Sequence, residues 1–324
     1  MSKQQVFLVG ATGETGSVIL EALLEDGSFD VTCFVRAASV AKPAVKQLQT
    51  RGIKIVAGDL TTSVQELISL LKGIDIVISV IFPINARDQI PLIDAAVEAG
   101  VKRFLPCNWG TPVARGGIMD LHDLKEEVHD HMFRKRLGFT IIDIGYWYQS
   151  SFPLVPSGRF DYAAFKPLNE VYAGGTARNM LIDKRDVGTI TVRIINDART
   201  LNKRVYAYGE VLTQNEIHAL IEKKTGEKLN LPAKSAEELY ATLEAARKEL
   251  DADPTNLPKT YLQVGAQYDV TKYVREDNTP ENADYLGYVN GRELYPDFEY
   301  RKFADFVDEL IDGKAQRVYP NVQL

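Results

Sequence analysis

The apolar positions of the first 145 residues form short runs separated by segments with a helical repeat. The runs contain few polar residues, as is typical of strands that helices cover on both faces. They lie at residues 6–9, 31–35, 53–57, 75–81, 102–107 and 139–144. Between them, apolar residues recur every three or four positions, which predicts helices at 17–25, 43–51, 63–72, 87–99 and 121–137. This alternation predicts an α/β fold with a doubly wound parallel sheet, the Rossmann arrangement.

The pattern changes from Gly145 onward. All 15 tyrosines lie at position 146 or later, and residues 151–178 are rich in proline, glycine and aromatic residues. A helix is expected between Thr213, a typical N-cap, and Gly226, a typical C-cap. The other expected elements are helices at 184–196, 233–251 and 300–312, a strand at 204–208 and a loop at 279–298. We expect a smaller C-terminal lobe whose tyrosines line a pocket for a flat, aromatic ligand or serve general packing.

The loop after the first apolar run has the spacing of a phosphate-binding turn. Three glycines, each separated from the next by two residues, lie between a predicted strand and a predicted helix. In such a turn, backbone N–H groups and the helix N-terminus face an anion. The spacing is Gly-x-x-Gly-x-x-Gly, not the more common Gly-x-Gly-x-x-Gly. The loop residues expected to bind a dinucleotide are Gly10, Ala11, Thr12, Gly13, Glu14, Thr15 and Gly16.

The residue that ends the second run indicates which dinucleotide is bound. An acidic residue there would accept hydrogen bonds from the adenosine ribose, but the sequence has Arg36, with Lys46 nearby. A guanidinium matches the geometry of a 2′-phosphate, so NADPH or NADP+ is the expected cofactor. Asp59 is expected beside the adenine, and Phe82 nearer the nicotinamide end.

Composition and charge narrow the class of protein. The net charge of −6 and the lack of basic clusters disfavour nucleic acid as a partner. No apolar segment reaches 18 residues and the start lacks a secretory pattern, so we expect a cytoplasmic protein without a membrane partner. Cys33 and Cys107 lie within apolar runs and are expected to be buried, reduced thiols.

A hydride transfer requires a group that handles a proton. The short-chain dehydrogenase pair Tyr-x-x-x-Lys has one literal match, Tyr268 to Lys272, which lies far beyond the sixth run and is treated as chance. The fifth predicted helix instead contains Lys125, with His122 and His129 on the same helical face. Lys125 and His122 are the candidate catalytic residues. The spacing of the histidines is poor for a metal, and none is expected.

The residues at these positions resemble the isoflavone reductase-like group of atypical short-chain dehydrogenases, which overlaps the NmrA-like proteins and includes pinoresinol–lariciresinol and phenylcoumaran benzylic ether reductases. The resemblance runs nearly end to end. It is carried by the segments "GATGETG" at 10–16, "EAGVKRFLPCNWG" at 98–110, "VGTITVRIINDARTLNK" at 187–203 with the helix that follows, and "ELYPDFEYRKFADFVDEL" at 293–310.

The resemblance implies an NADPH-dependent reductase in which Lys125 is the general base and Arg36 binds the 2′-phosphate. It also implies an NADP-binding Rossmann domain at 1–150 and a substrate-binding lobe at 151–324, with 183–208 returning to the Rossmann core. The chain has Cys107-Asn108-Trp109-Gly110 where the family has Ser-Glu-Phe-Gly, which brings Asn108 to the cofactor. Another aromatic or quinonoid substrate is therefore expected. The alternative function is that of a non-catalytic NADP-sensing regulator, and a sugar-nucleotide epimerase is a distant third. The sequence does not decide whether the protein forms a homodimer.

Overall fold

A computed structural model describes residues 3–320 of the chain. Its contacts divide the chain into two compact units. Unit 1 contains the chain up to Trp109 together with Leu121–Asp143 and Val187–Val205, and unit 2 contains Gly110–Asp120, Ile144–Asp186 and the chain from Tyr206 onward. Both units are therefore discontinuous. The sequence-based ranges were 1–150 and 151–324 with 183–208 returning to the Rossmann core, and unit 1 includes Val187–Val205. Residues 110–120 join unit 2, and unit 2 is the larger of the two.

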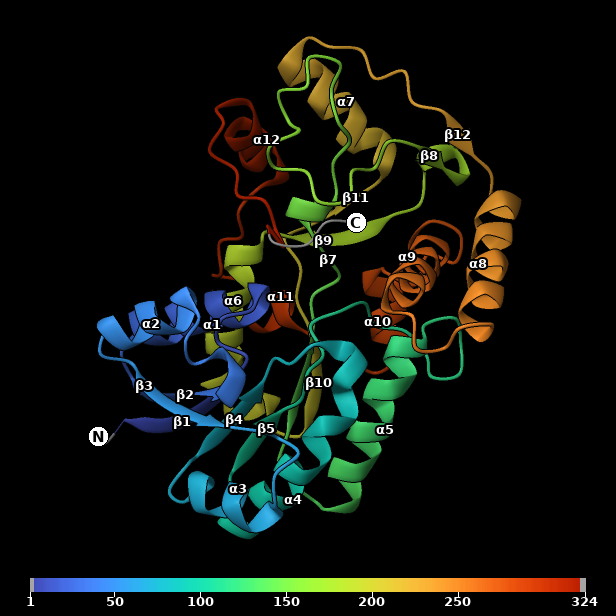
Figure 1. The fold of residues 1–324 in the computed structure, drawn as a ribbon. Coiled ribbons are helices and arrows are strands. Elements are labelled where there is room, and N and C mark those ends of the chain that lie inside the picture. Colours follow the sequence, from blue (N-terminus) through green and yellow to red (C-terminus); the bar gives the residue numbers. More distant parts are fainter. Residues whose placement is uncertain (1–2, 321–324) are drawn as a thin grey trace. The chain divides into compact units, whose positions relative to one another are not determined.

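The core of unit 1 is a five-stranded sheet in the order β3-β2-β1-β4-β5 (Figure 1). All its strand pairs are parallel, with Val9 of β1 beside Phe34 of β2 and Ser79 of β4. The strands are β1 (Gln4–Val9), β2 (Phe29–Arg36), β3 (Lys54–Gly58), β4 (Ile76–Ser79) and β5 (Arg103–Leu105). A parallel bridge between Phe104 and Phe139 links β5 to the segment entering β6 (Thr140–Asp143), which pairs with β10 (Lys203–Tyr206). The predicted parallel α/β sheet is confirmed.

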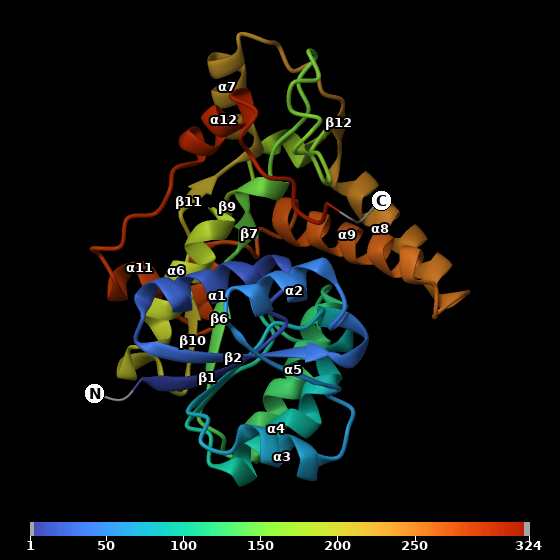
Figure 2. The same cartoon turned by 60° about the vertical axis from the view of Figure 1, so that its left-hand side comes forward.

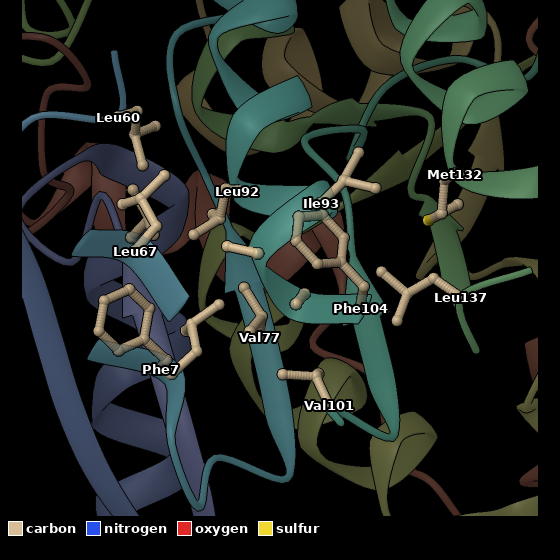
Figure 3. Close-up of a cluster of buried hydrophobic side chains, with 14 of the residues drawn as sticks. Phe7, Leu60, Leu67, Val77, Leu92, Ile93, Val101, Phe104, Met132 and Leu137 are labelled. Atoms are coloured by element: carbon tan, nitrogen blue, oxygen red, sulfur yellow. The ribbon is translucent and has the colours of Figure 1, made fainter. Parts of the chain in front are cut away.

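Helices cover both faces of the unit 1 sheet. Helices α3 and α4 lie below the sheet in Figure 1, and α1 and α2 lie above it. The lower face buries an apolar cluster that includes Phe7, Leu67, Val77, Ile93 and Phe104 (Figure 3). The helices are α1 (Glu14–Asp26), α2 (Pro43–Thr50), α3 (Val64–Leu71), α4 (Ile90–Ala99), α5 (Asp120–Arg134) and α6 (Lys184–Ile195), with the 3-10 helices η1 (Ala37–Ser39), η2 (Pro83–Gln89) and η5 (Ala198–Thr200).

Unit 2 combines short strands with longer helices. Strand β9 pairs in parallel with β7 and antiparallel with β11, while β8 pairs in parallel with β12. Helices α8 and α9 lie side by side as a pair (Figure 2). The strands are β7 (Tyr146–Trp147), β8 (Val171–Tyr172), β9 (Asn179–Ile182), β11 (Glu210–Leu212), β12 (Ala233–Lys234) and β13 (Val289–Asn290). The helices are α7 (Gln214–Thr225), α8 (Ala236–Asp251), α9 (Leu257–Tyr273), α10 (Pro280–Tyr285), α11 (Gly291–Leu294) and α12 (Phe303–Ile311), with η3 (Tyr148–Ser150) and η4 (Ala173–Gly175).

The caps predicted for α7 are confirmed. The Thr213 side chain accepts a hydrogen bond from the Glu216 backbone in a full capping box, and Gly226 ends the helix in a left-handed conformation. The expectation of a loop at 279–298 is wrong, because α10, β13 and α11 lie there. These elements contain only two to six residues, which is too short for a hydrophobic period to be read. No helix in residues 3–320 has the length and apolarity needed to cross a bilayer.

Candidate active site

The glycine loop closes the turn from β1 into α1 by close backbone contacts. Gly10 has a φ of +87°, and a Cβ at this position would lie 2.3 Å from the carbonyl oxygen of Val80. A Cβ at Gly16 would lie 2.1 Å from the carbonyl oxygen of Gly10, so the first turn of α1 is packed directly on the loop. Neither position can hold a larger residue without moving the backbone, because both clashes are with main-chain atoms.

The N-terminus of α1 is open to a ligand. Gly13 is its N-cap and offers no side-chain hydrogen bond, while a Cβ there would meet only the Gly10 oxygen at 3.4 Å. Thr12 and Gly13 are exposed, Glu14 and Thr15 are half-buried, and Ala11 is buried. A bare, uncapped helix start after a parallel strand suits a pyrophosphate, because its N–H groups and the helix dipole face negative charge. The loop residues therefore fit a dinucleotide.

The three residues predicted for the adenosine end lie at the ends of β2 and β3 and on α2. Arg36 is the exposed last residue of β2, directly beside Gly58 in the register with β3. Hydrogen bonds from the backbone and side chain of Thr61, with a smaller contribution from the Arg36 charge, hold the pKa of Asp59 below its usual value. Lys46 is an exposed residue of α2. Arg36 thus has its guanidinium at the surface, where a phosphate can reach it.

A segment with buried polar groups follows β5. The backbone N–H of Cys107 donates a hydrogen bond to Oε1 of the buried Gln89 side chain at 2.8 Å, and its thiol donates to the Ile81 carbonyl at 2.9 Å. Asn108 is 4% exposed, and neither atom of its side-chain amide has a hydrogen-bond partner among the described residues. The Ser79 hydroxyl at the end of β4 is likewise buried and unpaired within 3–320. Unpaired buried polar atoms at the carboxyl ends of parallel strands are where this fold class takes its ligand.

Lys125 lies on the buried side of α5. It is 6% exposed, and its amine donates a hydrogen bond of 2.8 Å to the carbonyl oxygen of Asn108. One N–H of an ammonium is used in this contact, so two remain for other acceptors. The structure therefore joins two of the predicted site residues, Lys125 and Asn108, at the carboxyl edge of the sheet that also carries the glycine loop.

Trp109 fixes the backbone beside Asn108. Its φ of +39° is left-handed, which is uncommon for an aromatic residue, and its N–H donates to the Ile142 carbonyl at 2.8 Å. The indole Nε1 donates to the Thr191 hydroxyl at 3.2 Å. Gln89 and Thr191 support the site through these hydrogen bonds, and no motif in the sequence points to either residue.

His122 and His129 do not gather around Lys125. Each has a ring nitrogen 3.2 Å from Oε1 of Glu126, which also receives a bidentate hydrogen bond from Arg204 at 2.6 and 2.7 Å. Burial raises the pKa of Glu126, but the hydrogen bonds from Arg204 and the two histidines outweigh it and hold that pKa far below its usual value. Burial lowers the pKa of His129, which is therefore neutral near pH 7. The contacts of His122 favour a structural role, and its catalytic role stays a prediction.

Two further predictions concern Phe82 and the two thiols. Phe82 follows β4 and is 44% exposed. Cys33 and Cys107 are both free and buried, and burial raises the pKa of both thiols. Within residues 3–320, the acidic, histidine and cysteine side chains form no group of three that could hold a metal ion.

This fold and this loop define a Rossmann-type protein of the class that binds dinucleotides. The model of the NmrA-like family matches residues 2–307, and the chain belongs to that family. Asnovolin J 5',6'-dehydrogenase nvfM of Aspergillus novofumigatus is 38% identical over 312 residues, with 95% of each chain covered. An isoflavone reductase-like protein of Olea europaea is 26% identical, covering 95% of this chain and 99% of its own. The resemblance read from the sequence is confirmed.

Solved structures share the fold. The structure "AtPrR2 with NADP+ and (+)pinoresinol" superposes with a TM-score of 0.76 at 25% identity, covering 96% of this chain and 99% of that one. The predicted α/β class therefore holds by comparison as well as by the strand order of unit 1.

Proposed function

We propose that the chain is an NADPH-dependent oxidoreductase that transfers a hydride to or from an aromatic or conjugated small molecule. The observation that carries this proposal is the buried Lys125 amine, donating to Asn108 at the same sheet edge as the glycine loop. The bound cofactor would supply the hydride as NADPH in the direction of reduction and would accept it as NADP+ in the direction of oxidation. The related proteins are named as a dehydrogenase and an isoflavone reductase-like protein, and a neighbouring structure is described with NADP+ and pinoresinol, which supports the cofactor and the substrate class.

The cofactor would be held by main-chain groups at one end and a guanidinium at the other. Gly10, Gly13 and Gly16 let the backbone approach the pyrophosphate, and the start of α1 faces its charge. Arg36 would pair with the 2′-phosphate, with Lys46 adding positive charge nearby. The Asn108 amide, whose two polar atoms have no partner in the described chain, would bind a carboxamide or carbonyl group.

Lys125 would move the proton that accompanies the hydride. Its bond to the Asn108 carbonyl fixes the amine while leaving N–H groups for a substrate oxygen. In the direction of reduction the amine would give a proton to that oxygen, and in the direction of oxidation it would accept one. The dehydrogenase relative makes both directions worth assaying.

The cofactor preference is tested by titrating NADPH and NADH against the protein and against Arg36→Ala. One charge-assisted contact is worth about 1.5–3 kcal/mol, so the wild type should prefer NADPH by about tenfold or more. Arg36→Ala should erase the preference. Arg51→Ala is the matched control, because Arg51 is an arginine on the same unit that pairs with Glu21 at 2.6 Å. Equal affinities in the wild type would remove the phosphate argument.

The proton role is tested by assaying Lys125→Met with a panel of phenols, enones and quinones. Turnover is measured from the change in NADPH absorbance, both for reduction with NADPH and for oxidation with NADP+. The variant should bind NADPH nearly as well as the wild type while losing turnover. Continued turnover in Lys125→Met would contradict the proposal. A wild type that binds NADPH tightly but turns over no compound of a broad panel would favour the NADP-sensing regulator.

A further inference from the structure

Unit 2 contains a buried amine that the proposed reaction does not use. Lys272 lies near the end of α9 and is 2% exposed. It is the lysine of the Tyr-x-x-x-Lys match from Tyr268 to Lys272, which lies far beyond the sixth apolar run. No hydrogen bond or ion pair joins its amine to a residue in the part of the chain that the structure describes. A buried lysine without an acceptor is unusual, since charged side chains are buried only when paired.

Aromatic rings surround the amine. Its Nζ lies 3.5 Å from the centroid of the Tyr146 ring and 4.7 Å from that of Tyr273. Tyr146 in turn contacts Tyr268 with ring centroids 5.6 Å apart, and Tyr273 contacts Tyr172 at 5.0 Å. Ring faces attract a cation, but they do not replace the three acceptors that an ammonium can engage. We call Lys272 with Tyr146, Tyr268 and Tyr273 the tyrosine enclosure.

The nearest charges leave Lys272 without a counter-ion. Asp269 is the acid whose charge reaches it, yet the Asp269 carboxylate is 3.3 Å from the amine of Lys166. Burial lowers the pKa of Lys272 to about 7, opposed by Asp269 and assisted by Lys166. Burial also raises the pKa of Tyr146 and of Tyr273, so neither phenol can become the missing anion near pH 7.

Tyr273 and the Lys272 backbone connect the enclosure to the lining of a small pocket within unit 2. Tyr273, one wall of the enclosure, also lines this pocket together with Ser151, Asn179, Leu181 and Gln214. Asn179 donates a hydrogen bond of 3.3 Å to the Lys272 carbonyl, so the pocket and the Lys272 backbone share a polar contact.

We propose that Lys272 is a ligand-binding residue whose amine binds the acidic oxygen of a phenol in the tyrosine enclosure. The proposal rests on the proposed function, since it names a residue of unit 2 that recognises the substrate. The phenolic oxygen supplies the acceptor and the negative charge that the described residues do not, and its ring packs against the tyrosines. A phosphate fits less well, because Lys166, the other cation whose charge reaches Lys272, is engaged by Asp269.

The alternative is that the amine serves packing alone, through its contacts with the rings. The two readings differ in what Lys272→Met does. This substitution removes a buried amine and keeps an unbranched side chain of similar length, so it should raise the midpoint of thermal unfolding. If the amine serves a ligand, the same variant should lose ligand binding while it becomes more stable.

The test uses 4-nitrophenol as the probe. Its control ligand is 4-nitroanisole, the methyl ether, which has no acidic O–H group. The wild type should bind 4-nitrophenol and shift its absorbance toward that of the phenolate at a pH where the free compound is mainly protonated. Lys272→Met should weaken that binding at least tenfold and abolish the shift, and 4-nitroanisole should bind weakly to both proteins. Lys259→Met is the matched control and should keep the shift, because Lys259 is a lysine of the same helix whose amine lies 3.7 Å from the Asp253 carboxylate.

Equal binding of 4-nitrophenol to Lys272→Met and wild type would overturn the proposal, as would a wild type that does not bind it. If Lys272→Met does not fold, as judged by far-UV circular dichroism, Lys272→Gln takes its place with the same expected loss. NADPH titration and turnover are measured separately. Turnover of a conjugated substrate without binding of 4-nitrophenol would contradict the Lys272 proposal and leave the proposed function standing. Binding of 4-nitrophenol through Lys272 without turnover of any substrate would contradict the proposed function and leave the Lys272 proposal standing.

Discussion

The buried carboxylate of Glu126 gives a stability prediction that can be worked from its contacts. Its side chain is 9% exposed and accepts both Nη atoms of Arg204, whose side chain is 24% exposed. Glu126→Gln keeps the shape but leaves the guanidinium with a neutral partner. Breaking a buried ion pair on one side typically costs about 3–5 kcal/mol. Because Arg204 is partly solvated, we expect the low end, about 3 kcal/mol.

Removing both charges should cost much less than removing one. In Glu126→Gln/Arg204→Met no unpaired charge is left, and we expect a loss of about 1 kcal/mol or less. Arg204→Met leaves the buried carboxylate without its main partner and should also cost about 3 kcal/mol, so the double-mutant cycle should give a coupling energy of about 5 kcal/mol. The pH dependence of stability follows from the lowered pKa of Glu126. The contribution of Glu126 to the free energy of unfolding is fully present above the unfolded-state pKa of about 4.3, and it is lost as the pH falls below that value.

The assay takes advantage of the two tryptophans, one in each unit. Trp109 belongs to unit 1 and Trp147 to unit 2, so Trp147→Phe leaves a fluorophore that reports unit 1. Urea unfolding is followed in this background for the wild-type pair, both single variants and the double variant. A coupling energy below about 0.5 kcal/mol, or single variants as stable as the parent, would refute the reasoning that Glu126 and Arg204 stabilise α5 as a unit.

Three other outcomes follow from the same structure. Gly16→Ala should destabilise the free protein because its Cβ would lie 2.1 Å from a backbone oxygen, whereas Gly13→Ala should keep stability and weaken NADPH binding, as compared by thermal unfolding and titration. Thr213→Ala should cost about 1 kcal/mol of unit 2 stability through loss of the α7 capping box, measured by Trp147 fluorescence in a Trp109→Phe background. Cys33 and Cys107 should resist iodoacetamide at pH 8 until urea is added, as read by mass spectrometry, because burial raises the pKa of both thiols.

The strand and helix order of unit 1 could be predicted because each element carries its own signal. Apolar runs mark β1 to β5, and the amphipathic repeats between them mark the helices. The predicted start of the first helix at residue 17 was late, since α1 begins at Glu14 with Gly13 as its N-cap. Glycines read as loop residues in a sequence, but the last of the three is already inside the helix.

The contacts within the candidate site could be predicted only in part. Lys125 could be chosen from its helix and from the family resemblance, but its partner is the carbonyl of Asn108, and any residue type offers a carbonyl. Glu126 and Arg204 are 78 positions apart, and only the folded arrangement of α5 and β10 brings them together. Both read as surface charges in the sequence, because charged residues are mostly exposed.

Lys125 and Lys272 illustrate why a sequence does not separate a buried lysine from a solvated one, because burial depends on the fold and not on the residue type. Both amines are less than a tenth exposed, but Lys125 has a carbonyl acceptor whereas Lys272 faces only rings within the described chain. Keeping an amine in either place costs stability that a methionine would not, since removing an ammonium from water is unfavourable. We therefore expect methionine at either position to raise the midpoint of thermal unfolding and to remove the turnover or the phenol binding that we propose for that amine.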